Sequence, residues 1–212
     1  MNKLGDLSCN EFLTELASAA PAPGGGGGAA MAGALAGALA SMVANLTIGK
    51  EKFADREPEV KELLEQAEAE RVRLLTLVDE DAAVFNSFMS CYKLPKTTDE
   101  EKAARTAAIR AAAKQAATVP LNIARSSFAV LKLADRLVVA GNPGVITGGG
   151  WSGDGLLARA ALRCAEYNVR INLGLTKDEV WNAQAAADLK KLLADAEALE
   201  TRLLAVTDKA LQ

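Results

Sequence analysis

Apolar side chains recur at helical spacing along most of the chain. From Val60 to Phe88 they fall three and four residues apart, which is the period of an amphipathic helix. Pro58 stands where a first-turn proline belongs, so we expect a helix from there to about Ser90. After the break at "LPKTT", the pattern predicts an alanine-rich helix up to about Val139, kinked at Pro120.

Three Ser/Thr-x-x-Glu strings mark helix starts, at Ser8, Thr98 and Thr176. In such a capping box, the side chains of the first and fourth residues satisfy free backbone N–H groups. The boxes predict a short helix after Ser8 and a last helix running from Thr176 to about Lys209. Another helix is expected over 156–173, after a segment, "AGNPGVITGGGWSGDG", that is typical of a loop.

We find neither strand alternation nor an internal repeat. The prediction is therefore one all-α domain over residues 1–212, a bundle of five or six helices, some of them long.

The stretch "PAPGGGGGAAMAGALAGALASMVANLTIGK", from Pro21 to Lys50, is unusual because it carries no charge before its last residue. It predicts a glycine-rich loop followed by a central helix of small residues. Gly33, Gly37 and Ser41 are four residues apart and form one flat face, which allows close packing against another helix.

Two other interpretations of this stretch fit less well. Alanine and glycine gain little from lipid, and acidic residues precede the stretch, so we expect neither a membrane span nor an export signal. Lys50 lies too far beyond the glycines for a phosphate-binding P-loop. The glycines can still offer backbone N–H groups at a helix N-terminus, where anions bind well.

The composition excludes several kinds of binding and catalysis. The net charge is −3 over 212 residues, which argues against binding to nucleic acid. Three widely spaced cysteines without a CxxC pair suggest neither disulfides nor a zinc site, and reduced thiols fit a cytoplasmic protein. The chain has no histidine, so acid–base chemistry would fall to carboxylates, lysine, tyrosine, a thiol or water, and we expect no metal.

Asp81 is the main candidate for such chemistry. It lies on the apolar face of its helix, three residues after Val78 and four before Phe85, whereas Asp79 and Glu80 point away from that face. Burial raises the pKa of a carboxyl group and is one way to make a general base. A buried aspartate satisfied by a lysine or a helix end would give the same spacing, which leaves both interpretations open.

The other candidate polar residues can also be explained by structural roles instead of a role in a site. Asn45, Thr47 and Lys50 follow the small-residue helix, where such groups commonly cap backbone carbonyls. Lys96 fits an exposed loop lysine. Asn168 and Asn172 lie near a predicted helix end and fit a capping role.

Three strings carry a family resemblance: "FLTELASAAPAPGGGGGAAMAGALAGALASMVANLTIGKEKF", "LPKTTDEEKAAR" and "LLARAALRCAEYNVRINL". Together they resemble the cyclodeaminase/methenyltetrahydrofolate cyclohydrolase family, whose fold also forms the C-terminal half of formiminotransferase-cyclodeaminase. The resemblance implies an all-α homodimer that acts on a small-molecule folate, without a further cofactor. It implies either hydrolysis of 5,10-methenyltetrahydrofolate to 10-formyltetrahydrofolate or ammonia-releasing ring closure of 5-formiminotetrahydrofolate.

The residues of the matching strings, with no formiminotransferase domain ahead of them, favour the stand-alone cyclohydrolases. On this resemblance Asp81 would be the base, and Lys50 or Lys96 would stabilise oxygen charge or bind the folate carboxylate. The expected substrate-binding residues are Gly24, Gly25, Gly26, Gly27, Asn45, Thr47, Asp154, Asn168 and Asn172.

The loop before the late helix departs from the family pattern. Thr147-Gly148 stands where a Ser-Asp pair is usual, and Ser152 with Asp154 can replace that pair after a shift. This departure keeps open a third possibility, a bundle that binds folate without catalysis.

Overall fold

The computed structural model describes residues 3–148 and 150–212 of the chain. Over these residues it is all α-helical, with six α-helices and no strand, as the sequence predicted. The helices are α1 (Cys9–Leu16), α2 (Gly25–Asn45), α3 (Glu57–Cys91), α4 (Asp99–Ala140), α5 (Gly150–Thr176) and α6 (Glu179–Ala210). Three short 3-10 turns, η1 (Leu4–Asp6), η2 (Glu51–Phe53) and η3 (Pro143–Gly148), complete the described elements.

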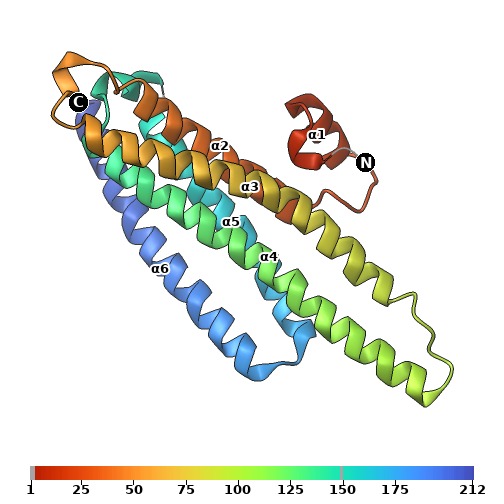
Figure 1. The fold of residues 1–212 in the computed structure, drawn as a ribbon. Coiled ribbons are helices and arrows are strands. Elements are labelled where there is room, and N and C mark those ends of the chain that lie inside the picture. Colours follow the sequence, from red (N-terminus) through yellow and green to blue (C-terminus); the bar gives the residue numbers. More distant parts are fainter. Residues whose placement is uncertain (1–2, 149) are drawn as a thin grey trace.

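The five long helices lie side by side, and α1 sits to one side of them (Figure 1). Helix α4 packs against α2, α3, α5 and α6, and α2 packs against α3, α4 and α5, while α6 covers α4 and α5. The connection between α3 and α4 extends beyond the beginning of α2 (Figure 1). The beginning of α2 therefore lies part-way along α3, with walls of α3, α4 and α5 around it.

The flat face of α2 packs against α3, as its spacing predicted. A Cβ added at Gly33 would lie 3.0 Å from a methyl group of Leu74, and one at Gly37 would lie 3.3 Å from the α-carbon of Arg71. Ser41 continues the face and donates a hydrogen bond of 2.6 Å to Glu68. Small residues every four positions thus let the two backbones approach closely.

By length and mean hydropathy, which is 1.5, α2 could cross a membrane, but 61% of its apolar stretch is buried inside the molecule. Core helices meet the same criterion, so this is weak evidence for a span.

Two capping boxes are confirmed and one is wrong. The side chains of Ser8 and Thr98 accept hydrogen bonds from the backbone N–H three residues later. The side chains of the glutamates at those positions accept hydrogen bonds from the backbone N–H of Ser8 and Thr98. Thr176 instead ends α5, and Asp178 caps α6 by accepting a bond of 3.0 Å from the Trp181 N–H. The aspartate can take this place because Lys177 adopts a positive φ of 56°, which turns the chain between the two helices.

Two predicted loops are in fact helical. Gly25 to Gly28 form the first turn of α2, with Gly24 as the N-cap residue. Helix α5 begins at Gly150 and not near 156. Its early glycines serve packing, since a Cβ at Gly153 would lie 3.2 Å from a methyl group of Leu39. Close helix contact therefore explains glycines that composition alone assigned to a loop.

Candidate active site

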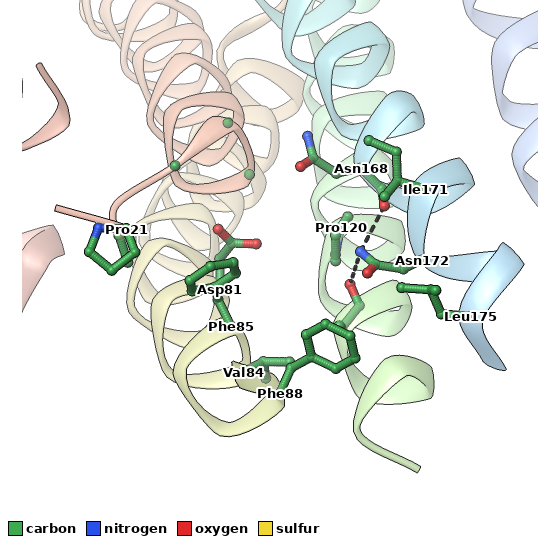
Figure 2. A pocket seen from close by; sticks show the side chains of 15 residues that line it. Pro21, Asp81, Val84, Phe85, Phe88, Pro120, Asn168, Ile171, Asn172 and Leu175 are labelled. Carbon is green, nitrogen blue, oxygen red and sulfur yellow. Dashed lines mark hydrogen bonds between the residues drawn. The ribbon is translucent and has the colours of Figure 1, made fainter. Parts of the chain in front are cut away.

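A pocket of about 280 Å³ opens beside the first turn of α2. Four segments enclose it: the start of α2 with the residues just before it, the second half of α3, the middle of α4 and the end of α5. Figure 2 shows the Asp81 carboxylate on one side and the amides of Asn168 and Asn172 on the other. The pocket thus brings together candidates that are up to about 150 residues apart in the chain, from Gly24 to Asn172.

Asp81 lies against the N-terminus of α2. Its carboxylate accepts a hydrogen bond from the backbone N–H of Gly27, which lowers its pKa, but burial is the larger effect, and the pKa is raised overall. The contact depends on Gly26, because a Cβ there would lie 2.7 Å from Asp81 Oδ2. The result is a partly buried carboxylate with a raised pKa at the positive end of a helix, which is suited to proton transfer.

The asparagines of α5 supply the opposite wall. Asn172 Nδ2 donates to the carbonyls of Ala116 and Asn168, each at 2.9 Å, and Asn168 Nδ2 donates to the Cys164 carbonyl at 2.9 Å. Asn168 also lies close to the α2 glycines, since a Cβ at Gly25 would be 3.5 Å from Asn168 Nδ2. Both amides are thus held by backbone carbonyls.

The rest of the pocket is largely apolar. The apolar residues that line it are Pro21, Ala22, Val84, Phe85, Phe88, Ala116, Pro120, Ile171 and Leu175. Aromatic and aliphatic walls with a few fixed polar groups suit a flat ring system that carries N–H and C=O groups at its edge. None of these residues is among the site residues expected from the sequence, although Phe85 and Phe88 follow Asp81 one and two helical turns later and share its face.

Several predicted site residues lie elsewhere. Asn45 and Lys50 are exposed at the opposite end of α2, and the rise of a helix places that end about 30 Å from the pocket. Thr47 is buried at the same end, where it donates to the Val43 carbonyl and accepts from the Asn142 N–H. Lys96 is exposed in the connection between α3 and α4. None of these four residues lines the pocket within this chain.

Asp154 is also separate from the pocket. Its side chain is fully buried near the start of α5, where burial raises its pKa to about 8. Its neighbour Gly155 packs against Leu131 and Leu203. Asp154 does not line the pocket within this chain, and its contact with substrate stays a prediction. The side chain of Ser152, the other half of the expected pair, lies outside the described residues.

Fold and site together define a class of protein: an all-α bundle whose pocket pairs one partly buried carboxylate with apolar walls and amides held by backbone carbonyls. The formiminotransferase-cyclodeaminase family model matches residues 8–191, and the chain belongs to this family.

Named relatives fall into two groups. The chain is 43% identical to a methenyltetrahydrofolate cyclohydrolase of Methylorubrum extorquens, over 94% of this chain and 95% of that protein. It is 33% identical to the formimidoyltransferase-cyclodeaminase of Rattus norvegicus over 91% of this chain, but it spans only 35% of that longer protein. The crystal structure of a formiminotetrahydrofolate cyclodeaminase from Thermotoga maritima has the same fold, with a TM-score of 0.87, 29% identity and 98% coverage of both chains.

Proposed function

We propose that the protein hydrolyses 5,10-methenyltetrahydrofolate to 10-formyltetrahydrofolate. The observation that carries the proposal is the 43% identity to a methenyltetrahydrofolate cyclohydrolase over nearly the full length of both chains. The pocket agrees with it, because Asp81 supplies a base where the chain has no histidine.

The substrate is a delocalised amidinium cation whose bridging carbon is already electrophilic. In the proposed mechanism the Asp81 carboxylate attracts this cation and removes a proton from the attacking water. The C–O bond forms, and the resulting neutral tetrahedral carbon bridges N5 and N10. The protonated Asp81 then returns its proton to N5, the C–N5 bond breaks, and the hydroxyl proton is released as the formyl group forms on N10.

The environment of Asp81 fits both halves of this cycle. Burial raises its pKa, so it can hold a proton briefly, while the Gly27 N–H favours the ionised form before the reaction begins. Phe85 and Phe88 would pack on the flat ring. Neither Lys50 nor Lys96 lines the pocket, so the reaction is proposed without them and with no cofactor beyond the folate.

A two-substrate assay tests the proposal. Purified protein is given 5,10-methenyltetrahydrofolate, and hydrolysis is followed by loss of its near-ultraviolet absorbance. The same sample is given 5-formiminotetrahydrofolate, with ammonia release as the readout. Faster turnover of the methenyl compound supports the cyclohydrolase. Ammonia release as the main activity would favour the cyclodeaminase, and folate binding without turnover of either compound would favour the non-catalytic bundle.

We also propose that the protein acts as a homodimer, joined through one face of α2 and α5. On α2, Leu35, Leu39, Met42 and Leu46 follow one another at helical spacing and are exposed or half-buried. On the adjoining α5, Leu156, Tyr167 and Ile171 are exposed, the last by 70%. Exposed apolar stripes of this kind suit a second copy of the same surface.

A further inference from the structure

Pro120 lies in the interior of α4, where a proline normally destabilises a helix. In a regular α-helix, the N–H of residue 120 would donate to the carbonyl of residue 116. Proline has no N–H, so the Ala116 carbonyl lacks its helical partner at the place where α4 lines the pocket. Such a carbonyl needs a donor from elsewhere.

That donor comes from α5. Asn172 Nδ2 donates to the Ala116 carbonyl at 2.9 Å and, within its own helix, to the Asn168 carbonyl at 2.9 Å (Figure 2). Both acceptors are carbonyl oxygens, so the atom that faces them must be the amide nitrogen. Turning the amide over would set its oxygen against two carbonyls and lose both bonds. The proline therefore fixes which end of the Asn172 amide is free.

The free end is the oxygen. Asn172 lines the pocket, and its Oδ1 accepts no hydrogen bond from any residue in the described part of the chain. Asn168 is a useful contrast: among the described residues its Nδ2 donates only to Cys164 of the same helix, and none of them bonds its amide to a second helix.

We infer that Pro120 is a positioning residue, which locks Asn172 so that its Oδ1 accepts a hydrogen bond from a ring N–H of the folate pterin. The inference rests on the proposed function, because that function supplies the ligand. A fixed acceptor selects ligands that present an N–H at this point. A ligand with an acceptor there would place that atom against Asn172 Oδ1, and neither atom would receive a hydrogen bond. Pro120 acts here through Asn172 and not through its own contact with the ring.

A double-mutant cycle tests whether Pro120 acts through Asn172 or through its own contact with the ring. The variants are Pro120→Ala, Asn172→Leu and the combination of both, each confirmed as folded by circular dichroism and thermal melting. Pro120→Ala restores the N–H, so that α4 can satisfy the Ala116 carbonyl itself and the amide is released. Val119→Ala is the matched control, because Val119 is buried beside Pro120, loses a similar volume and does not line the pocket.

The readouts are KM and kcat for methenyltetrahydrofolate and the Kd of 5-formyltetrahydrofolate measured by calorimetry. We expect Pro120→Ala to raise KM and Kd about tenfold, the worth of one hydrogen bond, with kcat nearly unchanged. Asn172→Leu should raise them at least as much, and adding Pro120→Ala to it should change nothing further. Val119→Ala should leave both constants as in the wild type.

Two results would overturn the inference. One is a Pro120→Ala variant with wild-type KM and Kd, and the other is an equal effect of this substitution with and without Asn172→Leu, which would indicate direct contact by the proline. In both cases an active wild type leaves the proposed function intact. A wild-type protein that neither binds 5-formyltetrahydrofolate nor hydrolyses the methenyl compound would remove the proposed function and this inference together.

Discussion

The carboxylate of Asp81 lies where a Cβ of residue 26 would be if that residue were not glycine. A Cβ at position 26 would lie 2.6 Å from Asp81 Cγ and 2.7 Å from Oδ2, closer than a Cβ atom comes to the non-bonded atoms of a folded protein. The neighbouring Gly27 donates its backbone N–H to the same carboxylate. The absence of side chains at Gly26 and Gly27 therefore lets a partly buried acid from α3 reach the N-terminus of α2.

Gly26→Ala should inactivate the enzyme without unfolding it. The new methyl group must displace the Asp81 carboxylate, and a shift of about 1 Å at a catalytic group can lower kcat about a hundredfold. Gly28→Ala is the control, because a Cβ there meets only a methyl group of Leu16 at 3.9 Å. This control should keep wild-type kcat and gain about 0.5 kcal/mol in free energy of unfolding, since alanine favours a helix. Equal kcat values in the two variants would contradict the assigned contact.

Asp81→Asn tests the base itself. It keeps the size of the side chain and an acceptor for the Gly27 N–H but removes the ionisable group, so kcat should fall about a hundredfold or more. Glu80→Gln, an exposed neighbour that leaves the pocket unchanged, should have wild-type kcat. A folded Asp81→Asn protein with an undiminished rate would exclude Asp81 as the base.

The pH dependence of kcat is a separate test of Asp81. A base works when it is ionised, so the rate should fall as the pH is lowered through the pKa of Asp81 in the folded protein. Burial raises that pKa, so the fall should begin at a higher pH than for an aspartate in water. The profile is obtained from the absorbance assay across the acid range, and a rate that stays flat to the ordinary pKa of aspartate would contradict the assignment.

Much of the fold could be predicted because it depends on local signals. Helical periodicity located α3 and α4, the capping boxes at Ser8 and Thr98 marked two helix starts, and the four-residue spacing of Gly33 and Gly37 indicated a tight helix crossing. Gly26, Gly153 and Gly155 show why composition assigns helical glycines to loops. Composition indicates that glycine is flexible, but only the packed structure shows that a side chain of a neighbouring helix lies where the Cβ of each of these three residues would be.

The candidate site was partly predictable. Asp81 was identifiable because its carboxylate interrupts an apolar face, which is a local property. Lys50 and Asn45 belong to the same sequence motif as the glycines of the site, which is why they are expected there. The length of α2 places them at the end of the helix that is far from the pocket. The relation between Pro120 and Asn172 could not be predicted, because it joins residues 52 positions apart through one backbone carbonyl, that of Ala116.

The proposed dimer predicts that a charge on the exposed face of α2 will separate the subunits. Leu35 is 49% exposed in a single chain, and Leu35→Glu would bury two carboxylates at a symmetric interface. We expect the wild type to sediment as a dimer and this variant as a monomer in analytical ultracentrifugation. Val180→Glu, at an apolar position that is 84% exposed on α6, should leave the dimer intact. A wild type that sediments as a monomer at assay concentrations would rule out this interface.

Asp154 should make the protein less stable as the pH rises through neutrality. Burial raises its pKa from 3.8 to about 8, so between these values the folded chain holds a proton that the unfolded chain has lost. Stability therefore falls with rising pH across this window, because folding then requires proton uptake. Asp154→Asn keeps an oxygen for the Gly155 N–H, which donates to Asp154 Oδ1 at 2.7 Å, but removes the titration. Thermal melting at about pH 5 and about pH 8 should show a smaller loss of Tm in this variant than in the wild type, and equal losses would mean that Asp154 does not titrate in this window.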